Sequence, residues 1–185
     1  MKKVFIIHGF EGSPNSAWIP WLMAELKTLG IYASSLTMPT PNEPKRVEWV
    51  EEIKRCIDKS PEDEIFLIGH SLGCAGILNY LQSEESRKVG ATILVSGRCQ
   101  KSNNPKTEEF YTYFDFEKIK SMSESFVVIH GDKDSFVPVE NAYILSEKLN
   151  IEPIIVEGAG HFTTGEGWRS MPLVLEKLKN ILENK

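Results

Sequence analysis

The chain has 185 residues, of which 41% are hydrophobic and 25% charged, and its net charge is −5. These values are typical of a globular protein with one domain, or at most two small ones, and they exclude disordered and collagen-like chains. No basic tail or face occurs, so nucleic acid is not an expected partner. No run approaches the roughly 18 apolar residues of a membrane span, and no secretory leader is predicted.

The three cysteines form no C-x-x-C pair. Neither a zinc site nor a disulfide framework is therefore predicted. Reduced thiols fit a cytoplasmic protein, which is the location we expect. The four histidines are not spaced i, i+2 or i, i+4, so the sequence predicts no metal site.

Short apolar runs alternate with longer amphipathic stretches along the chain. In order, they predict a strand at 4–7, a helix at about 18–29, a strand at 31–38, a helix from about 44 to 57, a strand at 65–68 and a helix at 72–82. The second half continues with strands at 91–95, 126–129 and 153–156 and with helices at about 139–149 and 172–182. Only residues 96–120 break this alternation. They are polar and then aromatic, and we expect a short lid-like or surface insertion there.

Alternation of strands and helices predicts an α/β domain with a parallel sheet covered on both faces, and the whole chain, 1–185, is assigned to it. Ligands of such sheets bind at the carboxyl ends of the strands. Strand–helix units of roughly 30 residues each use nearly the whole length. A large cap domain is therefore not expected, and the site should be shallow and open.

The residues after the third strand read Gly69-His70-Ser71-Leu72-Gly73, which matches G-x-S-x-G and leads directly into a helix. This pattern is typical of a nucleophile on a strained turn, where small residues two positions away let neighbouring chain segments come close. Its place between an apolar strand and a helix indicates that Ser71 is a nucleophile. The alternative is that Ser71 only forms a tight turn.

A serine nucleophile needs a base, and the base needs an orienting acid; on this kind of sheet they follow in the order Ser, Asp or Glu, His. The fifth strand runs into Asp132 and Asp134, and the sixth runs into a glycine-rich loop that contains His161. We predict His161 as the base. Asp134 is favoured as the acid, partly on the family pattern given below, while Asp132 is expected to bond backbone N–H groups of its turn.

Two backbone N–H groups are predicted to form the oxyanion hole. One is that of Leu72 at the start of the helix, and the other is that of Phe10 in the loop after the first strand. The remaining histidines are given other roles. His8 is expected near the pocket floor, His70 is expected to point away from the serine, and His130 to be packed at its strand end.

With His8-Gly9-Phe10, the 69–73 motif, the loop at 131–138 and the loop at 158–162 in this order, the chain resembles the α/β-hydrolase superfamily. More narrowly, it is similar to the small serine hydrolases of the retinoblastoma-binding protein 9 type, through its size and its Trp18-Ile19-Pro20-Trp21 segment. The resemblance implies that Ser71, Asp134 and His161 form a triad. It also implies a three-layer α/β/α sandwich whose six-stranded parallel sheet has the order 2-1-3-4-5-6.

The leading hypothesis is a cofactor-free serine hydrolase, carboxylesterase-like, that cleaves a small-molecule ester, thioester or amide. His8, Phe136, Phe162 and Trp168 are the side chains expected to shape its substrate pocket. The alternative is a protein-binding module of hydrolase fold with an idle triad. Residues 98–116 would then be a partner surface, although no partner is identified by the sequence.

Overall fold

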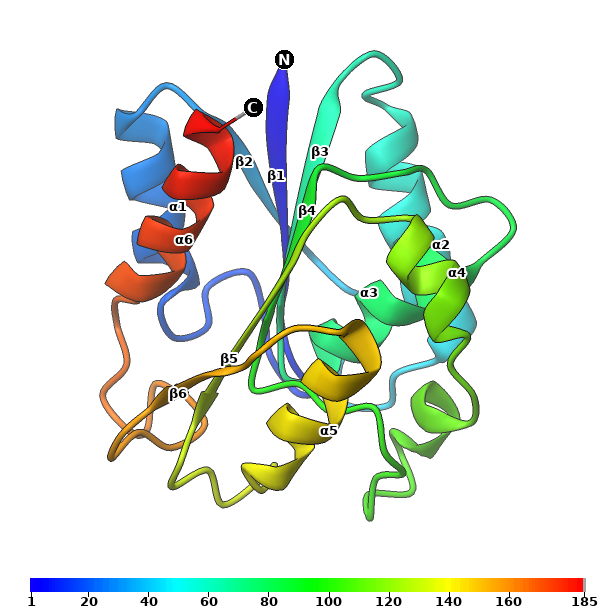
Figure 1. The fold of residues 1–185 in the computed structure, drawn as a ribbon, viewed down its shortest axis with the longest axis vertical. Coiled ribbons are helices and arrows are strands. Elements are labelled where there is room, and N and C mark those ends of the chain that lie inside the picture. The colour runs from blue at the N-terminus through cyan, green and yellow to red at the C-terminus, as the bar shows by residue number, and fades with distance from the viewer. Residues whose placement is uncertain (185) are drawn as a thin grey trace.

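The computed structural model describes residues 1–184, which are built around a parallel β-sheet (Figure 1). The strands are β1 (Lys2–Ile7), β2 (Tyr32–Leu36), β3 (Glu64–His70), β4 (Ala91–Val95), β5 (Phe126–Gly131) and β6 (Ile154–Val156). Their order is β2-β1-β3-β4-β5-β6, and each neighbouring pair is parallel. The predicted fold class and strand order are confirmed.

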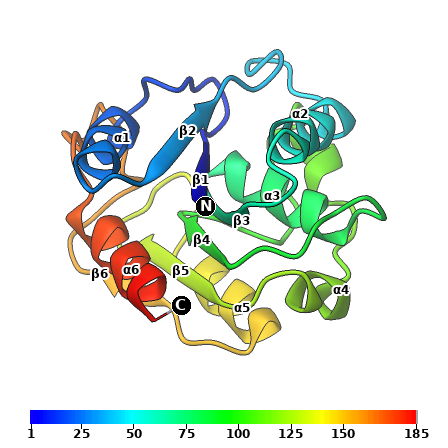
Figure 2. The same ribbon diagram turned by 90° about the horizontal axis from the view of Figure 1, so that it is seen from above.

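Helices cover both faces of this sheet (Figures 1 and 2). One layer consists of α1 (Ile19–Thr28) and α6 (Pro172–Glu183). The other consists of α2 (Arg46–Asp58), α3 (Leu72–Gln82), α4 (Phe116–Ser121) and α5 (Glu140–Leu149). Within residues 1–184, no helix has both the length and the apolar character that crossing a membrane requires.

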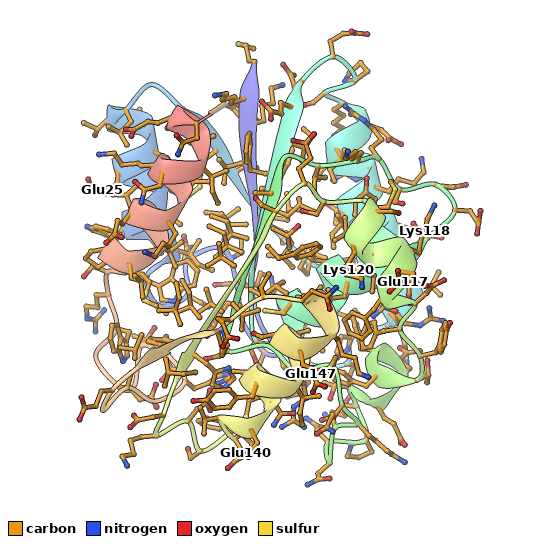
Figure 3. The ribbon with its side chains drawn as sticks, viewed as in Figure 1. Glu25, Glu117, Lys118, Lys120, Glu140 and Glu147 are labelled. Atoms are coloured by element: carbon orange, nitrogen blue, oxygen red, sulfur yellow. The ribbon has the colours of Figure 1, made fainter. Side chains whose placement is uncertain are left out.

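Side chains fill the space between the sheet and each helix layer (Figure 3). Along β1, Val4 and Ile6 belong to the core under α1 and α6, whereas Phe5 and Ile7 belong to the core under α2 and α3. Successive side chains of a strand point to opposite faces. A strand covered on both sides therefore reads as an unbroken apolar run, which explains why the sequence shows no alternation there.

The parallel strands place all their carboxyl ends at one edge of the sheet, which is the lower edge in Figure 1. There β1 lies between β2 and β3, so the chain leaves β1 and β3 in opposite directions along the sheet. Ile7 is level with Gly69, and His70 with Val95. The loops after β1, β3 and β4 therefore meet at a topological switch point, where ligands of such sheets bind.

The connection between β4 and β5 is more ordered than the sequence indicated. It contains a 3-10 helix, η1 (Glu108–Tyr111), and the short helix α4. Asp115 caps α4 by accepting a hydrogen bond from the N–H of Lys118 at 3.0 Å, and Ile119 is buried. Elements of four and six residues are too short to show a helical period, so their presence depends on packing.

Candidate active site

Ser71 lies on a strained turn between β3 and α3. Its φ of 54° and ψ of −118° place a non-glycine residue in the left-handed half of backbone space, at a cost of about 1–3 kcal/mol. The turn is held because the Ser71 N–H donates to Val95 O at 2.9 Å and the Cys74 N–H donates to Ser71 O at 3.0 Å. The strain is thus maintained by the neighbouring strand and by the helix itself.

Two glycines bring the end of β1 directly against this turn. A Cβ atom at Gly9 would lie 2.9 Å from Ser71 Cβ, and one at Gly73 would lie 2.2 Å from Ile7 O. Phe10 is thereby held beside the start of α3. In the described chain, neither the N–H of Phe10 nor that of Leu72 donates to a protein acceptor. Both residues line the same hollow as Ser71.

His161 and Asp134 are in direct contact, because His161 Nδ1 lies 2.7 Å from Asp134 Oδ2. The other carboxylate oxygen, Oδ1, accepts the N–H groups of Phe136 at 3.0 Å and Val137 at 2.8 Å. Burial opposes ionisation, but hydrogen bonds from His130 and His161 hold the pKa of Asp134 well below its usual range. The carboxylate therefore stays charged and fixes the imidazole that it faces.

Glu166 organises the loop that carries His161, a role that the sequence reasoning missed. One carboxylate oxygen accepts the His161 N–H at 3.0 Å, and the other accepts the N–H and hydroxyl of Thr163 at 2.9 and 3.0 Å. A Cβ at Gly160 would lie 2.0 Å from Glu166 Oε1. The spacing T-x-x-E from Thr163 to Glu166 is that of a capping box, and this was the available signal.

Two further histidines support the site. His70 Nε2 donates to the carbonyl of His161 at 2.8 Å, and the two rings lie 5.2 Å apart. His70 therefore contacts His161. The sequence predicted only that His70 points away from Ser71, and it indicated no partner for this side chain. His130 is fully buried, as expected, and its Nε2 donates to Val137 O at 2.8 Å and lies 3.4 Å from Asp134 Oδ2.

The loops after β5 and β6 are joined to each other. Asp132 Oδ1 accepts the N–H of Gly158 at 2.7 Å, and the Lys133 N–H donates to Ala159 O at 2.8 Å. Asp132 thus bonds a backbone N–H group, but in the loop of His161 rather than in its own turn. These bonds connect the segment of Asp134 to that of His161, which lies 27 residues further on.

Two hollows flank Ser71 and His161, and both residues line each of them. The larger, about 860 Å³, extends between residues 98–107 and the start of α5, which Glu140 marks in Figure 3. The smaller, about 280 Å³, lies between residues 9–17 and 163–165. In the described structure the Ser71 hydroxyl makes no hydrogen bond to His161. Hydrogen bonds between a nucleophile and its base often form only when substrate binds.

The four expected pocket side chains separate into two groups. Phe136 is 67% exposed, lines the larger hollow and stacks against His161 at 5.2 Å between ring centres. Phe162 and Trp168 contact each other at 4.7 Å in the core under α1 and α6, and His8 is buried against α2. None of these three lines either hollow. The side chains of these three residues pack within the protein. The residue type alone could not show whether an aromatic side chain packs in the core or contacts a substrate.

Known proteins match almost the whole chain. The family model described as serine hydrolase matches residues 4–180. The Bacillus subtilis protein YdeN is 32% identical over 180 residues, which cover 96% of this chain and 94% of YdeN. The crystal structure of the ydeN gene product has a TM-score of 0.92, covering 99% of this chain and 100% of that one.

One more distant relative and one solved structure of low identity are also similar to the chain. Serine hydrolase RBBP9 from Rattus norvegicus is 23% identical over 170 residues, 89% of each chain. Est1E from Butyrivibrio proteoclasticus, 17% identical, has the same fold with a TM-score of 0.71 over 96% of this chain and 88% of its own. The family model and the 32% identity to YdeN decide the assignment: the chain is a hydrolase and belongs to the serine hydrolase family.

Proposed function

We propose that the chain is a carboxylesterase-like hydrolase that cleaves a small-molecule ester, thioester or amide through an acyl-enzyme on Ser71. The observation that carries this proposal is the 2.7 Å contact between His161 and Asp134, placed at hollows that Ser71 also lines. Folding alone does not require these three side chains in one place. A strained serine, an imidazole and a buried carboxylate together support nucleophilic catalysis.

In this mechanism His161 donates its Nδ1 proton to the hydrogen bond with Asp134, which leaves Nε2 as the base. As the Ser71 oxygen attacks the substrate carbonyl carbon, Nε2 takes the hydroxyl proton. It then gives that proton to the departing alcohol, thiol or amine when the old bond breaks. Water attacks the acyl-enzyme in the same way, which releases the carboxylic acid and restores Ser71.

The N–H groups of Phe10 and Leu72 would stabilise the tetrahedral intermediates. Both lack a protein acceptor within residues 1–184 and line the larger hollow. An oxyanion would supply the missing acceptor, and a preorganised donor of this kind contributes about 3–4 kcal/mol to transition-state stabilisation. The start of α3 adds a favourable field, because helix N-termini attract negative charge.

A fluorophosphonate probe and a chain-length series of 4-nitrophenyl esters test the proposal. Est1E has been crystallised with ferulic acid bound, so an ester of an aromatic acid also belongs in the panel. We expect the wild type to be labelled once per chain and to hydrolyse part of the series. Ser71→Ala should abolish labelling, and Asp134→Asn should lower kcat by about 10³–10⁴-fold, because an amide holds the wrong tautomer of His161.

The matched control is Ser121→Ala, which removes a serine hydroxyl on α4 that donates to a backbone carbonyl. It should retain both labelling and hydrolysis. Equal labelling of the wild type and Ser71→Ala, or a folded wild type that neither reacts with the probe nor cleaves any ester, would refute the proposal. The second result would favour the alternative of a binding module with an idle triad.

A further inference from the structure

We infer that the larger hollow binds a substrate that carries a carboxylate, and that Arg98 recognises this group. The inference rests on the proposed function, since the carboxylate belongs to the molecule that Ser71 would cleave. Arg98 follows β4, lines the hollow and is half-buried. Its position is tied to the nucleophile through β4, because Val95 O accepts the Ser71 N–H at 2.9 Å.

The charge of Arg98 is not neutralised by the protein. In the described part of the chain, no carboxylate oxygen lies within 4.0 Å of its guanidinium nitrogens. Lys101 also lines the hollow, but it forms an ion pair with Glu108. The chain has a net charge of −5, yet this arginine, which lines the same hollow as Ser71, has no carboxylate partner in the described structure. Arginine is well suited to hold a carboxylate through paired N–H groups.

Its hydrogen bonds are also incomplete. A guanidinium has five N–H donors. Nη1 donates to Lys101 O at 3.4 Å and Nη2 to Phe136 O at 3.3 Å, both long, while the buried Nε has no acceptor in the described structure. Each Nη nitrogen therefore keeps one N–H free. Two weak bonds to neutral carbonyls hold the side chain in place without satisfying its charge.

Other groups of the hollow fit the same ligand. Tyr111 lines it, and within residues 1–184 its hydroxyl has no hydrogen-bond partner. Burial raises the pKa of Tyr111, so it stays a donor. Glu11 also lines the hollow and carries the same charge as this ligand. It is exposed in the loop after β1, however, and its charge acts on Lys106. Arg98 also contacts Phe136, whose ring lies 5.2 Å from that of His161.

Two pairs of esters test whether the carboxylate is read on the acyl or the alcohol side. The first is the mono-4-nitrophenyl ester of adipic acid against its methyl ester, and the second is 4-acetoxybenzoate against methyl 4-acetoxybenzoate. Within a pair the carboxylate is replaced by its methyl ester, which removes the charge and adds one methyl group. Release of 4-nitrophenol in the first pair, and of the phenol from its acetate in the second, reports cleavage of the same bond in both members. We expect the wild type to prefer the anionic member of at least one pair in kcat/KM, mainly through a lower KM. Arg98→Gln should lower that preference on the order of 10- to 100-fold.

Two further variants make the test specific. Arg98→Lys keeps the charge and should retain a larger part of the preference than Arg98→Gln. Lys106 belongs to the same segment, but it pairs with Glu43 outside the hollow. Lys106→Gln therefore removes a nearby cation, and its preference should stay within about twofold of the wild-type value. Each preference is a ratio within one variant, so a partly unfolded sample does not distort it.

The failures of the two proposals are distinguishable. Hydrolysis of the neutral esters that depends on Ser71, together with no anionic preference or with equal preference in Arg98→Gln, would overturn this inference and leave the proposed function standing. A preference that Lys106→Gln reduces as much as Arg98→Gln would also overturn it, since general charge would then be the cause. No hydrolysis of any ester and no labelling of Ser71 would overturn both.

Discussion

Gly73 and Gly76 lie one turn apart on α3, and alanine at the two positions should have opposite effects. A Cβ at Gly73 would lie 2.2 Å from Ile7 O and 2.7 Å from His8 O, which are backbone atoms at the end of β1. Since a carbon and an oxygen in contact prefer about 3.3–3.6 Å, the helix or the strand must retreat by about 1 Å. At Gly76 the nearest atoms are Trp49 Cε3 at 3.4 Å and Ile53 Cδ1 at 3.6 Å.

The magnitudes follow from these contacts. Alanine gains about 1 kcal/mol over glycine inside a helix. Overpacking a rigid contact costs about 1–3 kcal/mol or more, and β1 is held by β2 and β3 on both sides. We expect Gly76→Ala to raise the free energy of unfolding by about 0.5–1 kcal/mol and Gly73→Ala to lower it by about 1–2 kcal/mol. The two variants have the same composition, so their difference isolates the contact.

Urea unfolding of both variants measures this difference, and thermal midpoints should separate by at least about 3 °C in a chain of this size. Gly73→Ala should also lower kcat by at least about 10-fold, because the retreat separates Leu72 from Phe10. Gly76→Ala should retain wild-type kcat. Equal stability of the two variants within about 0.5 kcal/mol, with activity intact in both, would refute the role given to the close approach of β1 and α3.

Three further predictions concern the surroundings of the site. Glu166→Ala should lower kcat about 5- to 30-fold, because it leaves the His161 N–H without its acceptor at a cost of about 1–2 kcal/mol. Glu166→Gln keeps an acceptor oxygen and should lower kcat less. Equal losses of kcat in the two folded variants, measured by steady-state kinetics, would contradict this prediction. Burial and the neighbouring charge of His161 lower the pKa of His70 to about 4, so the unfolded chain binds a proton first as the pH falls. The free energy of unfolding should therefore drop by roughly 3 kcal/mol between about pH 6.5 and 4 because of this group. Protonation of Asp134, whose pKa is low, should lower the free energy of unfolding further only below about pH 4. Urea titrations across the upper range should show a smaller drop in His70→Gln, and an identical drop would exclude His70 as the cause. Burial raises the pKa of Cys74 far above the usual thiol range, so iodoacetamide at pH 8 should leave hydrolysis unchanged, and inactivation by alkylation of Cys74 would contradict the burial argument.

The elements that the sequence predicted correctly are those whose pattern is local. The α3 helix spans Leu72–Gln82 and β4 spans Ala91–Val95, as expected from apolar runs and their ends. The other strands and helices end within a few residues of their predicted bounds. Few topologies remain once the strands are parallel and their crossovers obey the usual rules. The strand order of the sheet could therefore be predicted from the same pattern together with the family resemblance.

Candidate chemistry was also visible locally, because a nucleophile turn needs glycines at fixed positions. The sequence could therefore nominate Ser71, Asp134 and His161, whose catalytic roles stay predictions. It could not nominate Glu166 or place His70, since their partners are set by how the loop after β6 lies against β3. Nor could it separate Phe136 from Phe162, because exposure at the hollow and burial in the core depend on which face of the sheet each loop covers.

A length of 185 residues left little room for anything beyond strands, helices and short loops. The sequence by itself thus determined the α/β fold class and nominated the residues of the site, since periodicity and motifs that span a few residues are enough for both. Only the tertiary structure decided what surrounds the site: the two hollows, the contacts behind His161 and an Arg98 without a carboxylate partner in the described chain. Those features join segments far apart in sequence, and the packing that brings such segments together has no local signature.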